Sequence, residues 1–267
     1  MELKREIRFS SRVSLVISLL DAWTCQAPIG KITLELEGVR TKAVNKSNGS
    51  YIFSDLPHGD YILRVNAEHY FDIQVPLSTN LVRMIEHIPL QPLPSYPFSQ
   101  GATLIRAILQ DQNGSPIRGA RVTATVESEE CASARLMSEK VEKGADLLTV
   151  GSVIGAITAG SSFVLRGRGA KAADEWICIK EVLEFQKRLQ LQQPLEGSFS
   201  RGAVLLPVIQ TRSTERGELV LPFRTGRNSS FGVNITIARE GGESRRLLKE
   251  VMVSEGAVTN LGTQVLT

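Results

Sequence analysis

Residues 47–65 read SNGSYIFSDLPHGDYILRV and carry the pattern of two short strands on either side of a tight turn. Apolar and polar side chains alternate before the break at Pro57 and alternate again after it, as in half-buried strands. Asn48 and Gly49 tolerate the positive φ angles that turns require. The stretch therefore predicts part of a small antiparallel β-sandwich.

The composition of the chain is that of a folded protein. It has 267 residues, of which 42% are hydrophobic and 22% charged, and this length is enough for two domains with a core each. The net charge of +3 is too small and too evenly spread to indicate a nucleic-acid partner. Cys25, Cys131 and Cys178 share no metal-ligand spacing, so either Cys131 and Cys178 form a disulfide or all three are buried thiols.

The pattern of residues 47–65 has a counterpart later in the chain. A Pro-Ile pair precedes an alternating strand at residues 28–29 and again at residues 116–117. From Pro28 to Gly49 is 21 positions, whereas from Pro116 to the corresponding Gly217 is 101 positions. The chain is therefore predicted to contain an internal repeat, with about 80 extra residues inside the second copy.

These observations define a domain prediction. We expect a first β-sandwich over residues 1–92, a proline-rich linker over 93–100, and a second β-sandwich over 101–267 with an insertion at about 128–210. The predicted fold class is mainly β, with two tandem antiparallel Ig-like or prealbumin-like β-sandwiches and a partly helical insertion in the second. The apolar residues 13–20 are interpreted as the first strand rather than as a cleaved signal peptide.

The insertion holds the candidate interaction residues. Residues 132–143 and 172–193 are predicted as helices, and the second helix is predicted either to cover its own sandwich or to dock on a partner. The candidate docking residues are Trp176, Ile179, Leu183, Phe185 and Leu189. Residues 147–165 are apolar but rich in Gly, Ser and Thr, which favours a buried strand pair or a partner-docking segment over a membrane span. The candidate exposed apolar residues there are Val153, Ile154, Ile157 and Phe163.

Three sequence segments carry a resemblance to a known family. DQNGSPIRGARV at residues 111–122, GELVL at 217–221 and GSYIFSDLPHGDY at 49–61 are similar to the signatures of carboxypeptidase regulatory-like domains, which are transthyretin-like or Cna-B-type β-sandwiches. The resemblance covers most of the chain outside residues 128–210 and implies two such domains in tandem. In that family the sandwich is a stabilising, spacing or adhesive module without catalytic groups of its own.

No catalytic, cofactor-binding or metal-binding constellation is recognised in the sequence. It has no Gly-x-Ser-x-Gly elbow, no His-Glu-x-x-His and no Walker-type phosphate loop, and the zinc carboxypeptidase ligands are missing. We therefore expect a non-enzymatic structural protein that assembles with other protein subunits, without nucleic acid or a membrane, in a setting such as a phage-tail-like or contractile injection particle made in the cytoplasm. The alternative is an extracellular adhesive or carbohydrate-binding module.

Overall fold

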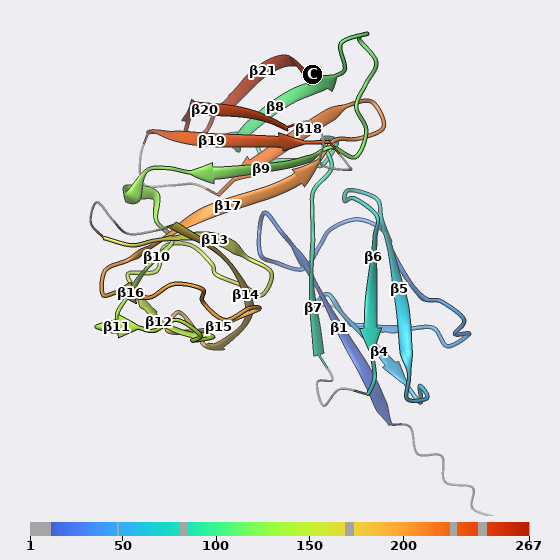
Figure 1. Ribbon diagram of the computed structural model, residues 1–267. Coiled ribbons are helices and arrows are strands. Elements are labelled where there is room, and N and C mark those ends of the chain that lie inside the picture. Colours follow the sequence, from blue (N-terminus) through green and yellow to red (C-terminus); the bar gives the residue numbers. More distant parts are fainter. Residues whose placement is uncertain are drawn as a thin grey trace, which may run out of the picture. The chain divides into compact units, whose positions relative to one another are not determined.

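β-Strands make up nearly all of the regular structure in the computed structural model, which describes residues 12–46, 48–80, 85–168, 174–224, 229–239 and 245–266 (Figure 1). The chain divides into two compact units. The first contains Met1–Leu20 and Ala27–Leu90, and the second contains Asp21–Gln26 and Gln91–Thr267. The prediction of a mainly β protein is confirmed. The sequence also predicts strands over residues 7–20 and 82–90, of which residues 7–11 and 82–84 lie outside the described residues.

The first unit is a sandwich of two β-sheets. One sheet has the strand order β3-β4-β1-β7 and the other has the order β2-β5-β6. The strands are β1 (Val13–Asp21), β2 (Ile32–Leu36), β3 (Val44–Asn45), β4 (Ser50–Ser54), β5 (Asp60–Ala67), β6 (Ile73–Ser78) and β7 (Ile85–Leu90).

The turn after β4 carries the chain from one sheet to the other. β4 pairs with β1, whereas β5 pairs with β2 and β6, so the two strands of residues 47–65 do not form a hairpin with each other. The buried side chains explain this, because Phe53 in β4 and Leu63 in β5 both face the core between the sheets and are fully buried. The tyrosine hydroxyl of Tyr61 donates to the carbonyl oxygen of Pro57 at 2.8 Å and closes the turn.

The second unit contains a sandwich built in the same strand order as the first. Its two sheets are β17-β9-β19-β20 and β18-β8-β21. The strands β8, β9, β18, β19, β20 and β21 follow one another as β1, β2, β4, β5, β6 and β7 do in the first unit. Their bounds are β8 (Thr103–Gln110), β9 (Arg121–Val126), β17 (Val204–Arg212), β18 (Glu218–Phe223), β19 (Ser230–Ala238), β20 (Arg245–Ser254) and β21 (Val258–Val265).

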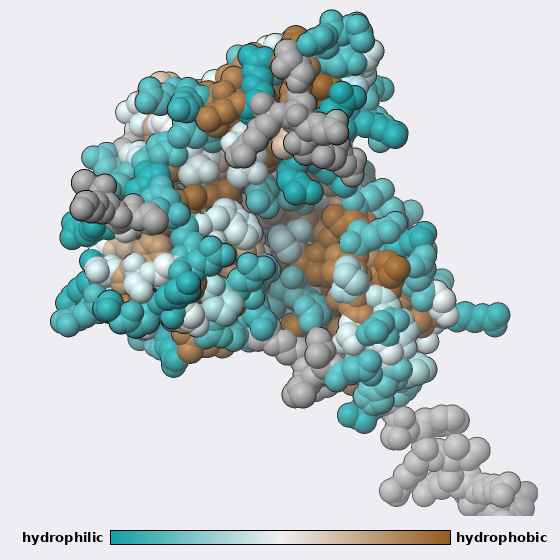
Figure 2. Space-filling model, viewed as in Figure 1, coloured by the Kyte–Doolittle hydropathy of each residue, from teal (hydrophilic) through white to brown (hydrophobic). Residues whose placement is uncertain are grey.

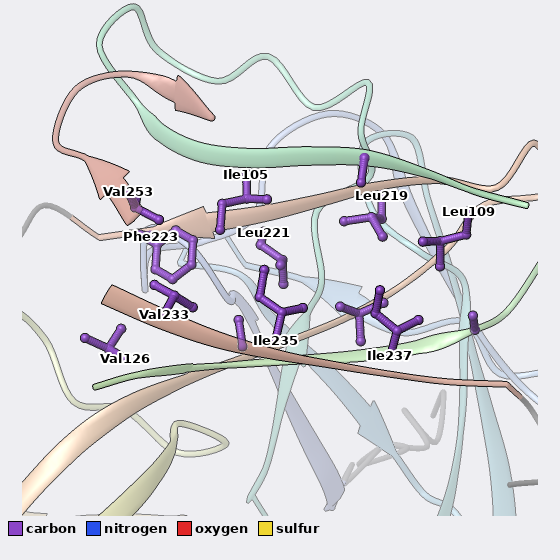
Figure 3. Packing of buried hydrophobic residues seen from close by; sticks show 14 of the residues in the cluster. Ile105, Leu109, Val126, Leu219, Leu221, Phe223, Val233, Ile235, Ile237 and Val253 are labelled. Atoms are coloured by element: carbon purple, nitrogen blue, oxygen red, sulfur yellow. The ribbon is translucent and has the colours of Figure 1, made fainter. Parts of the chain in front are cut away.

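The core of this sandwich lies between the two sheets. Figure 3 shows Ile105 and Leu221 from one sheet pointing toward Val233 and Ile235 from the other, and all four are almost completely buried. Strict alternation in β9 and β19 produces this face, because every second residue of both strands is apolar and points inward. Phe223 and Phe231 pack edge to face at one end of the core, with ring centroids 5.5 Å apart.

The insertion consists of strands, so the prediction of a partly helical insertion is wrong over its described residues. The sole helical element among them is η1 (Glu129–Cys131), and residues 174–184 and 188–191 form strands instead of the predicted helix. The strands are β10 (Ala134–Leu136), β11 (Lys140–Val141), β12 (Leu147–Gly151), β13 (Ser162–Arg166), β14 (Asp174–Glu184), β15 (Arg188–Leu191) and β16 (Phe199–Ser200). Ile177 and Ile179 alternate with exposed or half-buried neighbours in β14, which is the period of a strand.

Residues Asp21–Gln26 are held within the second unit by an aromatic cluster. The indole of Trp23 packs edge-on against Tyr96 and Phe98, with centroid distances of 5.8 and 5.0 Å. The carboxylate of Asp21 accepts a hydrogen bond from the Tyr96 hydroxyl at 2.7 Å. The guanidinium of Arg224 donates to the carbonyl oxygens of Trp23 and Ala22, each at 2.9 Å.

A candidate docking surface on the inserted barrel

Six strands of the insertion region close into a barrel. The pairings run β10-β12-β15-β14-β13-β17, and β17 pairs back to β10, so the ring has no open edge. Every pairing in the ring is antiparallel. Closure satisfies the backbone groups that a small isolated sheet would expose, which lets about 80 residues form a stable structure inside a connection of the sandwich.

The barrel interior is filled with apolar side chains from all six strands. Leu136, Leu148, Leu165, Ile179 and Leu189 are each 2% exposed or less. The inward residues alternate with outward ones along each strand, as expected for a small barrel. The barrel therefore has a core separate from the sandwich core.

The predicted docking residues lie on both faces of the barrel wall. Trp176, Leu183 and Phe185 are 50%, 47% and 77% exposed, whereas Ile179 and Leu189 are fully buried in the barrel core. The docking prediction is wrong for Ile179 and Leu189, because a strand sends successive side chains to opposite faces while the predicted helix grouped them on one side. For Trp176, Leu183 and Phe185 it stays a prediction.

The predicted exposed apolar segment is largely inside. Phe163 in β13 and Ile157 in the preceding connection are 4% and 8% exposed, and both belong to the barrel core. Val153 packs against that core and, like Ile154, is half-buried. The prediction of exposure is therefore wrong for Ile157 and Phe163, because both side chains point into the apolar core of the barrel.

The β14–β15 turn carries Phe185, the most exposed large apolar side chain among the described barrel residues, with Leu183 two positions before it. Two register shifts in the pairing of β14 with β15 fall at residues 179–181 and 182–184 and place Leu183 beside the tip. Phe185 follows, and Gln186 has a φ of 58°, which turns the chain back into β15. Glu184 and Lys187 form an ion pair of 2.8 Å across the turn, so the charges around Phe185 are neutralised locally.

Met137 is another exposed apolar residue on the outer face of the barrel. It was not among the docking residues predicted from the sequence. Its backbone N–H donates to Thr149, which lies opposite Arg188, and Arg188 lies opposite Glu184. This register places Met137, which is 43% exposed, in the outward row that ends at the β14–β15 tip. The alternation of buried Ala134 and Leu136 with Arg135 was the signal that could have found it. We call Leu183 and Phe185 the tip surface.

Most of the barrel face seen in Figure 2 is hydrophilic, with small separate hydrophobic areas. Exposed apolar side chains at a single point are ordinary on a protein surface. The tip surface differs from such an isolated side chain because it combines two exposed apolar residues, Leu183 and Phe185, that are only two positions apart in the chain.

Arg166 and two carboxylates connect the barrel to the second sandwich. The Arg166 guanidinium donates two parallel hydrogen bonds to the carboxylate of Asp174, from Nε to Oδ1 at 3.1 Å and from Nη2 to Oδ2 at 2.7 Å, and donates to the carboxylate of Glu127 at 2.9 Å. Arg166 and Asp174 belong to β13 and β14, whereas Glu127 follows β9 of the sandwich. The hydrogen bonds that Arg166 donates to Asp174 and to Glu127 raise the pKa of Arg166 above its usual value despite its partial burial.

The described residues contain no group of three or more His, Cys, Asp or Glu side chains that could hold a metal ion. Cys25, Cys131 and Cys178 are free thiols, and burial raises the pKa of both Cys131 and Cys178. A search of the described part of the chain for helices found none long and apolar enough to cross a membrane.

No known family model and no curated protein matches the chain. Solved structures with partial similarity include a DUF3823 family protein from Bacteroides ovatus, with 11% identity over 92% of this chain and 98% of that one and a TM-score of 0.22. The Bacillus anthracis TIE protein has 9% identity over 96% of this chain and 51% of its own, with a TM-score of 0.24. A streptococcal ancillary pilin has 11% identity over 96% and 99% of the two chains, with a TM-score of 0.19. Similarity at this level carries no argument about function.

Proposed function

We propose that the chain is a non-enzymatic structural protein that assembles with other protein subunits through its inserted barrel. The observation that carries the proposal is the tip surface, where Leu183 and Phe185 are 47% and 77% exposed on a barrel whose other large apolar residues are mostly packed inside. Transferring such a side chain from water into an interface is worth about 1.5–3 kcal/mol. A partner that covers both residues would gain enough to specify the contact.

The second sandwich would support this surface, because β17 runs from the barrel into it. We propose that the two sandwiches are modules of one kind, of the carboxypeptidase regulatory-like type that the sequence signatures resemble. Arg166 would keep the barrel oriented on the second sandwich through its bonds to Glu127 and Asp174. A phage-tail-like or contractile injection particle is one setting for such a subunit. An extracellular adhesive or carbohydrate-binding role is the alternative, which a glycan-binding screen of the full chain would address.

The test is the assembly state of the full chain and of two matched variants. The first variant is Leu183→Ser with Phe185→Ser, which removes the apolar tip without touching the barrel core. The control is Val44→Ser, which changes an apolar residue of the first unit whose exposure (56%) lies between those of Leu183 and Phe185. Light scattering after size exclusion would measure self-association, and affinity capture from the native source would measure association with other subunits.

We expect the wild type and Val44→Ser to behave alike, and the tip variant to lose self-association or a captured subunit. The tip surface is not the assembly site if all three proteins associate equally with the same partners. The proposal of an assembly protein fails if the wild type neither self-associates nor retains a partner that the tip variant loses.

A further inference from the structure

The edge strand β2 of the first sandwich pairs with another described strand on one side only. β2 (Ile32–Leu36) pairs with β5 and lies at the end of the sheet β2-β5-β6. In the second sandwich the corresponding strand β9 pairs with β19 on one side and, antiparallel over residues 121–125, with β17 on the other. Among the residues that the structure describes, the same side of β2 is therefore open, although this architecture accepts a strand there.

The backbone groups at this edge are directed toward an incoming strand. The backbone N–H of Glu68 donates to the carbonyl oxygen of Lys31 at 3.0 Å, which fixes the phase of the ladder between β2 and β5. Hydrogen-bonded and non-hydrogen-bonded pairs alternate along an antiparallel ladder, so the odd-numbered residues of β2 bond to β5. The N–H and C=O groups of Ile32 and Leu34 therefore point out of the open edge.

The other described sheet edges of the first unit are poorly suited to strand addition. β6 contains Pro76 and β7 contains Pro89, and proline has no N–H to donate to a new strand. β3 consists of two residues. β2 has five residues and no proline, so it is the edge at which the sheet can be extended.

The charges beside this edge indicate which strand fits. Lys31, directly before β2, and Glu35 are exposed, and Thr33 lies between them on the same side of the strand. If two copies of β2 pair antiparallel about a twofold axis at Thr33, Lys31 of each copy lies opposite Glu35 of the other. On the other side of the strand Ile32 lies opposite Leu34, and the backbone groups of both are directed at each other. β2 is therefore complementary to itself in charge and in hydrogen-bonding phase.

Other registers of the same pair are less favourable. An axis at Glu35 would place two carboxylates directly opposite each other, which destabilises a sheet. An axis at Leu34 would place Lys31 opposite Glu37, whose carboxylate already accepts a hydrogen bond from Arg64. An axis between two residues would oppose residues whose backbone groups point in different directions.

We infer that two copies of the chain pair through β2, which would join their sheets into one antiparallel sheet of strand order β6-β5-β2-β2-β5-β6. Each of the two Ile32–Leu34 pairs would exchange backbone hydrogen bonds, and a Lys31–Glu35 pair would lie on either side of the axis. The contact shares no residue with the tip surface. A chain without the tip surface would therefore lose a captured subunit and keep the β2 dimer, so each surface can fail without the other.

The first test is a charge swap, measured by sedimentation equilibrium. All proteins are full-length and carry Leu183→Ser and Phe185→Ser, so that association through the tip surface does not contribute. Lys31→Glu and Glu35→Lys should each weaken dimerisation about tenfold, because both symmetry-related pairs then join like charges. The two changes together restore opposite charges and should recover most of the affinity. The control is Lys42→Glu, which makes the same change in net charge at an exposed position outside β2 and should leave the affinity nearly unchanged.

The second test is a cysteine at the twofold axis. Thr33→Cys would place two thiols opposite each other in a non-hydrogen-bonded pair, where Cα atoms are about 4.5 Å apart and a disulfide can form. Glu35→Cys is the matched control on the same strand, because its counterpart in the second copy would lie four positions further along, about 13 Å away. Mild oxidation and non-reducing gel electrophoresis should reveal a linked dimer for Thr33→Cys and only the wild-type background for Glu35→Cys.

Three results would overturn the inference. The first is a chain that stays monomeric at about 1 mM, which would leave the β2 edge to a strand of a different protein. The second is a charge swap that recovers no affinity, or a loss in Lys42→Glu as large as that in Lys31→Glu. The third is equal cross-linking of Thr33→Cys and Glu35→Cys. The cross-linking test keeps both charges of the Thr33→Cys chain, so it decides the question if a charge variant fails to fold.

Discussion

Replacement of Phe163 by alanine tests whether the insertion is the closed barrel described above. Phe163 lies in β13, between β14 and β17, and is 4% exposed in the barrel core. Phe→Ala at a packed core position costs about 3–5 kcal/mol, because the ring's burial is lost and a cavity remains. The matched control is Phe185→Ala, the same chemical change at a site that is 77% exposed, which should cost no more than about 0.5 kcal/mol.

Hydrogen exchange of the β13 and β14 amides measures this difference where it arises. A loss of about 3 kcal/mol raises the opening constant of these strands more than a hundredfold. Phe185→Ala should leave their protection nearly unchanged. Equal protection in the two variants, or a loss below about 1 kcal/mol in Phe163→Ala, would refute the assignment of Phe163 to a packed core and with it the barrel.

Three further predictions concern other parts of the second unit. Arg166→Lys should destabilise it by about 1–2 kcal/mol in urea unfolding, because lysine cannot make the paired bonds that Arg166 donates to the two oxygens of Asp174; an unchanged midpoint would mean that the cluster with Glu127 contributes nothing. Gly217→Ala should cost at least 2 kcal/mol more than Gly114→Ala, since both have φ near +75 to +79° but only at Gly217 would a methyl group clash with a backbone carbonyl oxygen; similar midpoints would contradict this. Cys178 should react with iodoacetamide more slowly in the folded protein than after unfolding, and its rate should rise only at higher pH, because burial raises the pKa of its thiol and lowers the thiolate fraction at any given pH; a rate equal to that of the unfolded chain would contradict it.

The sandwich strands could be predicted from the sequence because their pattern is local. Buried residues alternate with half-buried or exposed ones along β1 and β9 without interruption. Turn residues such as Asn48 and Gly49 mark where strands begin. The sheet to which each strand belongs is not a local property. The turn after β4 was therefore placed correctly while the partners of β4 and β5 were not evident.

The strands of the insertion were predicted as helices because bulges interrupt the two-residue alternation of β14. The register shifts in β14 move Val182 inward and Leu183 outward, so Ile179 and Leu183 recur at an interval that is also typical of a helix. Closure of the ring depends on pairings such as β10 with β17, which are about 70 residues apart in the chain. The exposure of Leu183 and Phe185, and the burial of Phe163, follow from that closure.

β17 belongs to both the barrel and the second sandwich. Its first half pairs with β13 in the barrel, and its second half pairs with β9 in the sandwich. A force applied to the barrel would travel along this backbone and load the β17–β9 hydrogen bonds in shear, all at once, rather than opening them one after another from an end. Val208, where the two pairings meet, is the point at which tension would pass from one fold to the other. A subunit held by its barrel would therefore resist extension as a single mechanical element.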